Sequence, residues 1–98
     1  MLVKIIKSYR DIIIVCDSDL IGKKFEDDKF QLDLKGEFFK GEETAEEKVI
    51  EIMQNMSKED ATFNIVGGKS INTALEAGII NKEGIKKIQD VPFALVLL

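Results

Sequence analysis

The amino-acid sequence predicts an α/β fold, a mixed β-sheet with about two principal helices packed on it, in one compact domain of residues 1–98. Three observations predict it. β-branched apolar runs recur along the chain, two stretches carry apolar residues at helical spacing, and turn residues separate these segments. With 45% hydrophobic and 33% charged residues, the composition is that of an ordinary folded protein.

The first half of the chain is expected to open with a β-hairpin. The runs LVKII and DIIIVC are short and β-branched, and KSYR separates them. Asp17 is expected to cap a short helical turn by accepting a hydrogen bond from an amide of residues 18–20, and Gly22 to end that turn in a left-handed conformation. Strict alternation in FQLDL predicts a half-buried strand, and GEFFKGEE predicts a loop.

The second half carries both predicted helices. Thr44 followed by Glu47 is a capping-box pattern, which predicts a helix through about Met56. ATFNIV predicts a strand, and SINTALEA predicts a helix that Gly78 stops. NKEG predicts a turn and IKKI a short strand, and Pro92 is expected just before a last strand, FALVLL. Because VPFALVLL is apolar on both strand faces, we expect it either inside the sheet or buried in a homodimer.

The composition excludes several kinds of chemistry. The chain has no histidine, which removes Ser-His-Asp and Cys-His constellations, histidine metal ligands and a histidine general base. Its one cysteine, Cys16, excludes an internal disulfide and a multi-cysteine zinc site. Catalysis, if present, would have to use carboxylates, lysines, Tyr9, Cys16 or a metal held by Asp and Glu. We predict no catalytic residue, metal or cofactor, and we favour a protein that is not an enzyme.

The hydropathy and charge patterns bear on location and partners. No signal peptide is indicated, and the longest apolar run is too short to span a bilayer, so we expect a cytoplasmic protein without a membrane partner. The net charge is −4, and residues 25–60 carry five basic and twelve acidic side chains. Nucleic-acid binding normally needs a basic surface, so this acidity makes it an unlikely function.

NIVGGKSINTA, residues 64–74, is the stretch that most resembles a phosphate-binding loop. A Walker A loop also needs a glycine five residues before Gly68, and that position is Phe63. Two interpretations remain. Gly67, Gly68, Lys69 and Ser70 could hold one phosphate, sulfate or carboxylate at a helix N-terminus. Alternatively, the glycines only permit a tight turn and Ser70 caps the helix.

Two further candidates adjoin each other in the sequence. Asp17-Ser18-Asp19 matches a metal-binding D-x-D pattern, but a helix cap with an acid in the first turn explains it more simply. Cys16 ends an apolar strand, where a buried thiol is usually inert.

Several segments together resemble a small archaeal family called domain of unknown function 424. They are VCDSDLIGKKF, GEFFKGE, ATFNIVGGKSINTALEAGII and VPFALV, and they span Val15 to Val96. The positions that fit the family pattern include, without an assigned role, Cys16, Asp17, Gly22, Lys23, Asn64 and Pro92. The chain departs from the pattern at Phe39, where the family has Tyr, and at Phe93, where it has His. If those two were a catalytic pair in relatives, this chain has lost both polar ends.

The resemblance implies an uncharacterised archaeal protein associated with the translation machinery, and it implies no activity. We therefore favour a non-enzymatic binding module with a protein or ribonucleoprotein partner. One alternative is a small enzyme or anion-binding protein built on Gly67–Ser70, with Asp17 and Asn64 nearby. Another is a structural protein that associates with itself, which keeps a homodimer among the expected states.

Overall fold

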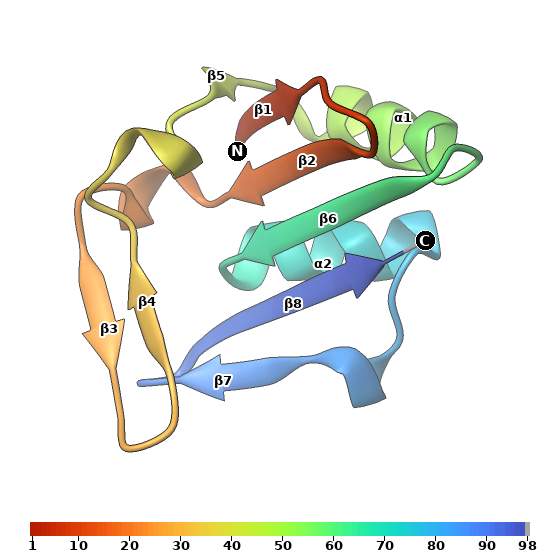
Figure 1. The fold of residues 1–98 in the computed structure, drawn as a ribbon. Coiled ribbons are helices and arrows are strands. Elements are labelled where there is room, and N and C mark those ends of the chain that lie inside the picture. The colour runs from red at the N-terminus through yellow and green to blue at the C-terminus, as the bar shows by residue number, and fades with distance from the viewer. Residues whose placement is uncertain (98) are drawn as a thin grey trace.

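A six-stranded mixed sheet forms the centre of the molecule, and both helices cover one of its faces (Figure 1). The computed structural model describes residues 1–97. The strand order is β5-β1-β2-β6-β8-β7, in which β2 and β6 run parallel and the other neighbours antiparallel. The prediction of two helices on a mixed sheet, beginning with a β-hairpin, is confirmed.

The sheet contains β1 (Leu2–Ile6), β2 (Asp11–Cys16), β5 (Glu42–Glu43), β6 (Ala61–Val66), β7 (Lys86–Ile88) and β8 (Val91–Leu97). A separate hairpin pairs β3 (Lys24–Glu26) with β4 (Gln31–Asp33). The helices are α1 (Glu46–Met56) and α2 (Gly68–Ala77), and three short 3-10 turns are η1 (Ser18–Leu20), η2 (Glu37–Phe39) and η3 (Lys82–Gly84). No helix within residues 1–97 is long and apolar enough to cross a membrane.

The main hydrophobic core lies between the sheet and the two helices. Alternate residues of each strand point to this side, because side chains of a strand alternate between the two faces. The buried side chains that build it come from four strands and both helices: Val3, Ile13, Val15, Phe63, Ile65, Ala94, Val49, Met53, Ile71 and Ala74. The β-branched runs therefore form strands for the reason expected, which is burial against helices.

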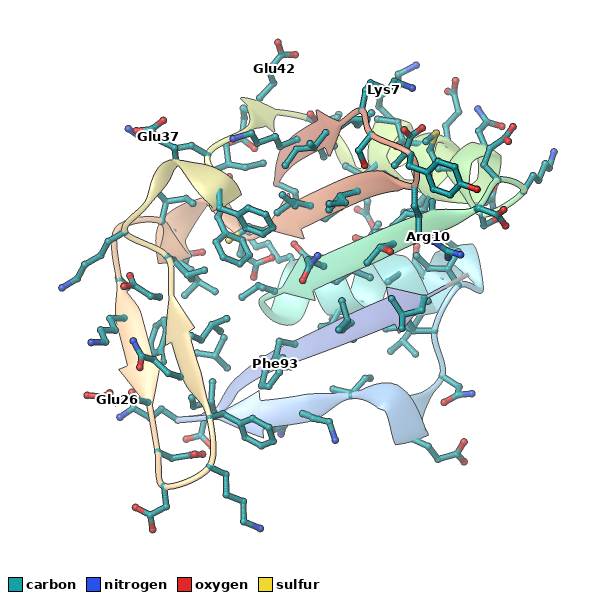
Figure 2. All side chains as sticks on the ribbon, viewed as in Figure 1. Lys7, Arg10, Glu26, Glu37, Glu42 and Phe93 are labelled. Atoms are coloured by element: carbon teal, nitrogen blue, oxygen red, sulfur yellow. The ribbon has the colours of Figure 1, made fainter. Side chains whose placement is uncertain are left out.

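A second apolar cluster lies on the opposite face, under the β3–β4 hairpin. Cys16, Leu34 and Val66 are buried in it, and Phe39 and Phe93 pack against it. The ring of Phe93 meets that of Phe30 edge to face, with centroids 5.8 Å apart. Figure 2 shows Phe93 on the face turned toward the viewer, beside this hairpin. The two departures from the family pattern, Phe39 and Phe93, are thus packing residues here.

The predicted cap of the first helix is wrong. α1 begins at Glu46, and no side chain caps it. The Thr44 hydroxyl instead donates to the Glu42 carbonyl at 2.8 Å, and the Thr44 amide donates to the Met1 carbonyl at 2.7 Å. Thr44 continues the pairing with the β1 side of the sheet, so its side chain does not turn toward the helix.

The last strand begins earlier than the sequence indicated. Gln89 and Asp90 both have positive φ, and they form the two-residue turn that lets Val91 pair with Ile88. Pro92 consequently lies inside β8, opposite Lys87, and not ahead of it. β8 lies between β6 and β7, so it is inside the sheet, which was one of the two expected outcomes. Leu98 lies outside the described residues. A homodimer remains a prediction.

Candidate functional site

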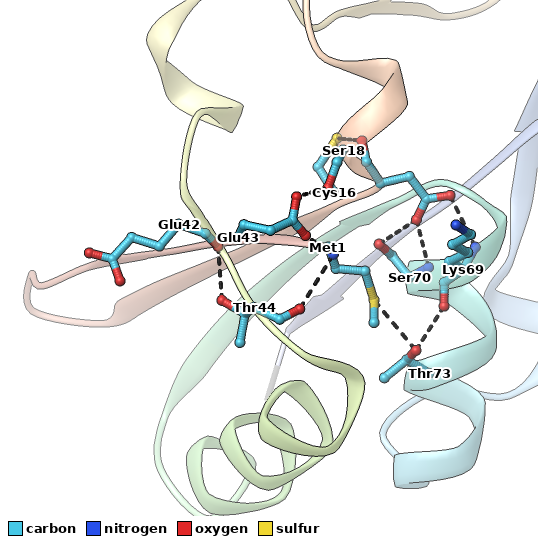
Figure 3. Close-up of polar contacts among 10 residues, drawn as sticks. Met1, Cys16, Ser18, Glu42, Glu43, Thr44, Lys69, Ser70 and Thr73 are labelled. Carbon is cyan, nitrogen blue, oxygen red and sulfur yellow. Dashed lines mark hydrogen bonds and ion pairs between the residues drawn. The ribbon is translucent and has the colours of Figure 1, made fainter.

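The carboxylate of Asp17 lies at the N-terminus of α2 (Figure 3). Oδ1 accepts from the Ser70 amide at 2.8 Å and from the Ser70 hydroxyl at 2.7 Å. Oδ2 accepts from the Lys69 amide at 3.0 Å. The amides at a helix N-terminus have no partner inside the helix and carry partial positive charge, so a carboxylate there satisfies and stabilises them. Asp17 therefore caps a helix that begins about fifty residues further along the chain.

The chain reaches this geometry because β2 and β6 are parallel neighbours that end at the same edge of the sheet. Cys16 is paired with Val66 at their ends, and the Asp17 amide donates to the Val66 carbonyl at 3.0 Å. The residues that follow the two strands, Asp17 and Gly67, are therefore placed side by side. The Gly67 amide donates to the Pro92 carbonyl at 2.8 Å, which ties β8 to the same corner.

Gly67 is required for the close approach of Asp17. Its φ is +107°, a conformation that side chains disfavour, and a Cβ atom there would overlap the Asp17 carboxyl group. At Gly68 a Cβ atom would meet open space. The two adjacent glycines thus have different roles, and only the first is required by the cap.

Two expectations about Asp17 and Ser70 are wrong. The side chain of Asp17 makes no cap hydrogen bond in η1, so its partners are not the amides of residues 18–20. Ser70 is not the cap of α2, since the helix begins at Gly68 and the Ser70 hydroxyl donates to Asp17. Asp17 is 7% exposed and Ser70 is fully buried, so the contact is an internal one.

The amides of Lys69 and Ser70, which the sequence marked for an external anion, are thus engaged by the chain's own carboxylate. An external anion at Gly67–Ser70 remains a prediction, and it would have to displace or adjoin Asp17. The Lys69 side chain is exposed, and Lys69 lines a cleft of about 560 Å³ with Glu46, Asn72 and Glu76. The acids Glu46 and Glu76 line that cleft together with Lys69 and the N-terminal residue Met1, so its lining does not select for an anion.

Cys16 is fully buried, and its thiol donates to the Asp17 carbonyl at 3.4 Å. Burial, followed by the nearby charges of Asp17 and Asp19, raises the pKa of the Cys16 thiol to about 12. The thiolate is the nucleophilic form, so this cysteine is held in its unreactive state. Within residues 1–97, no cluster of three or more carboxylate or thiol side chains is arranged to hold a metal ion.

A polar network beside this corner closes the sheet edge at β5 (Figure 3). The Met1 amino group donates to the Glu43 carboxylate, whose other oxygen accepts from the Ser18 hydroxyl at 2.5 Å. The hydrogen bond from the Met1 amino group, followed by that from Ser18, lowers the pKa of Glu43. The network joins β1, β5 and η1, and its carboxylate is already satisfied.

The remaining family-motif residues do not all join this corner. Gly22, with φ of +86°, and the exposed Lys23 lie in the lead into the β3–β4 hairpin, where the Gly22 amide donates to Leu34. Asn64 lies on the opposite side of β6 from the helices, because its paired residue Ile14 alternates with the core residues Ile13 and Val15. Six candidates therefore gather at the α2 N-terminus: Cys16, Asp17, Gly67, Gly68, Lys69 and Ser70, with the Pro92 carbonyl beside them.

Sequence reasoning missed the face of the sheet opposite the helices, which we call the open face, although the β3–β4 hairpin covers its end at Cys16, Val66 and Phe93. By register it carries Ile6, Ile12, Thr62 and Leu97 in one cross-strand row, and Lys4, Ile14, Asn64 and Leu95 in the next. Leu95 is 61% and Leu97 70% exposed, and both lie on β8. Polar residues at alternate positions of VPFALVLL would have identified the uncovered face. All its residues are apolar, so the sequence did not distinguish the two faces of this strand.

The fold and the contact of Asp17 with the α2 N-terminus define a class of protein. It is a small α/β domain in which a carboxylate of the chain caps the helix at the carboxyl ends of the two parallel strands. The model of the family described as "Protein of unknown function (DUF424)" matches residues 7–98, and the chain belongs to that family. A solved structure titled "Crystal structure of an uncharacterized conserved protein from Methanopyrus kandleri" has a similar fold, with a TM-score of 0.82 and 18% sequence identity. The similarity covers 98% of this chain and 90% of that one. No curated protein matches the sequence.

Proposed function

We propose that this protein is a non-enzymatic, cytoplasmic binding module that recognises a partner protein through the open face of its sheet. The observation that supports the proposal is the uneven cover of the sheet: both helices pack on one face, whereas the β3–β4 hairpin covers only one end of the other, which exposes Leu95 and Leu97. Exposed apolar side chains that adjoin one another on a rigid surface commonly mark an interaction site.

The α2 N-terminus supports the same proposal, because the position where a ligand would be expected is occupied by the chain itself. In open α/β sheets, ligands bind outside the carboxyl ends of parallel strands. Here the ends of β2 and β6 are closed by Asp17 on the Lys69 and Ser70 amides. The usual ligand position is thus used for stability, whereas the open face exposes apolar side chains at Leu95 and Leu97.

Affinity capture with a matched pair of variants tests the proposal. The tagged protein is incubated with a lysate of its source organism, and recovered proteins are quantified by mass spectrometry. Because the family resemblance implies an association with translation, ribosomal proteins and initiation factors are the first partners to look for. The test variant is Leu95→Thr with Leu97→Thr, which keeps β-propensity but removes exposed apolar surface.

The control variant is Glu47→Ala with Gln54→Ala on the exposed side of α1, away from the open face. A specific partner should be recovered with the parent and the control and lost with the test variant, while melting curves show that all three proteins fold. Equal recovery with the test variant would mean that the open face is not the binding surface, and the proposal would be withdrawn.

A further inference from the structure

We infer that the open face binds an amphipathic helix of a partner protein that carries acidic residues on both sides of its apolar stripe. The inference rests on the proposed function and names the chemistry of the partner. Its basis is the juxtaposition of exposed leucines on β8 with the lysines on strands at either side, Lys4 on β1 and Lys86 on β7.

Among the described residues, the charged strand side chains of the open face that have no partner of opposite charge are positive. Lys86 is paired with Phe93, and Lys4 with Ile14, so both lysines belong to this face. The acid on its strand positions within residues 1–97 is Glu43, paired with Leu2, and its carboxylate is held by the Met1 amino group and Ser18. The nearby carboxylate of Glu37, on η2 beside Lys4, is paired with the Lys40 ammonium. A partner that approaches the face therefore meets positive charge at its two sides.

The lysines stay on the face because contacts hold them there. The Lys4 ammonium donates to the Glu37 carbonyl at 2.8 Å, and the Lys86 ammonium lies 6.0 Å from the centroid of the Phe30 ring. Neither contact neutralises the charge. Both cations are thus positioned before any partner arrives, and fixed complementary charges favour partner choice and association rate.

A helix fits this surface better than a strand does. An added strand would need unpaired backbone groups, and those lie at sheet edges and not on a face. A helix buries an apolar stripe, and a helix on the open face would complete a three-layer arrangement with α1 and α2 on the other side. Neighbouring strands are about 4.8 Å apart, so β1 and β7 are roughly 19 Å apart. Because η2 and the β3–β4 hairpin lie over one end of this face, a helix about 10 Å wide would lie over the other end, along Leu95 and Leu97, with an acidic side chain toward each lysine.

Other occupants fit the face less well. Two copies of this chain placed face to face would bring lysine-bearing surfaces together, which opposes self-association. Single-stranded nucleic acid binds on aromatic rings, but the exposed side chains of β8 here are leucines. The partly exposed rings of Phe30 and Phe38 are engaged edge to face with Phe93 and Phe39. The apolar centre with cations on both sides selects an acidic amphipathic helix.

The test uses two designed helical peptides of about 18 residues that share a leucine stripe and differ only in whether Glu or Lys flanks it. Binding to the full chain is followed by NMR of the leucine methyl groups. The Glu-flanked peptide should shift the Leu95 and Leu97 signals and bind about tenfold more tightly than the Lys-flanked peptide at low salt. This preference should shrink at high salt, because salt screens exposed charges.

Two variants on one strand give the matched control. Lys86 points to the open face, whereas Lys87, paired with Pro92, points to the other. Lys86→Glu should remove most of the preference for the Glu-flanked peptide, and Lys87→Glu should leave it unchanged. An equal effect of the two variants, equal affinity for both peptides, or no methyl shift would each overturn the inference.

Two further outcomes would also overturn it and name another occupant. Concentration-dependent dimerisation that protects the same methyl groups would assign the face to a second copy. Shifts produced by a single-stranded RNA oligonucleotide but not by the peptides would assign it to nucleic acid. If the captured partner depends on Leu95 and Leu97 while the peptides fail, the helix inference falls and the proposed function stands. Failure of both experiments removes both.

Discussion

Replacing Asp17 with alanine is expected to lower the free energy of unfolding by about 3 kcal/mol. The carboxylate accepts three hydrogen bonds, two from amides of the first turn of α2 and one from the Ser70 hydroxyl. Hydrogen bonds to a charged group contribute roughly 1.5–3 kcal/mol each, and they are not additive. Loss of a helix cap alone costs about 0.5–2 kcal/mol. We expect about 3 kcal/mol because water can reach the exposed Lys69 side of the site and replace part of the lost hydrogen bonding.

Urea denaturation followed by circular dichroism measures this effect, and Asp19→Ala is the matched control. Asp19 lies two residues away and is exposed, so its removal should change the free energy by less than about 0.5 kcal/mol. Asp17→Asn should fall between them, at about 1.5 kcal/mol. It keeps Oδ1 as an acceptor for Ser70 but turns an amide group toward the Lys69 N–H. Equal transition midpoints for Asp17→Ala and Asp19→Ala, at equal slope, would refute the reasoning.

Three other outcomes are expected. Gly67→Ala should destabilise the protein by more than about 2 kcal/mol in the same assay, whereas Gly68→Ala should be neutral or slightly stabilising, because only the first position has positive φ and no room for Cβ. Cys16 should react with a thiol reagent at pH 8 only as fast as the chain unfolds. Its pKa is raised from an ordinary value of 9.0 to about 12, so the stability it contributes is fully present below pH 9 and is lost as the pH rises toward 12, a slope that Cys16→Ala should remove. Millimolar ATP should leave the melting temperature unchanged in the parent and in Lys69→Ala, since the loop lacks the wrapping half of a Walker A motif; a Lys69-dependent rise would contradict this.

The sequence was sufficient for much of the fold because burial follows local patterns. β6 has the bounds of its β-branched run, Ala61–Val66, and α2 ends where Gly78 adopts a left-handed conformation. Element boundaries that depend on pairing were less predictable. β8 begins at Val91 only because Gln89 and Asp90 accept positive φ, a conformation that glycine or asparagine would have announced more clearly.

The candidate site was predictable in its residues but not in its contacts. Asp17 and Gly67–Ser70 were both singled out, yet each was explained within its own segment. A capping rule relates a side chain to amides two or three residues ahead, and it has no means of finding amides that begin more than fifty residues away. Only the parallel pairing of β2 with β6, which places Asp17 beside Gly67, joins the two patterns.

The position of Asp17 at the α2 N-terminus bears on which ligands the protein can bind. A helix N-terminus at the carboxyl end of two parallel strands is a natural place for a phosphate or a carboxylate, and many α/β proteins bind their ligands there. In this chain the position holds the carboxylate of Asp17, the residue after β2, a glycine whose missing side chain admits it, and a serine hydroxyl that donates to it. The same groups that would recognise an external anion thus stabilise the fold. Under the proposed function, recognition comes from the open face, which is apolar at Leu95 and Leu97 and positive at Lys4 and Lys86.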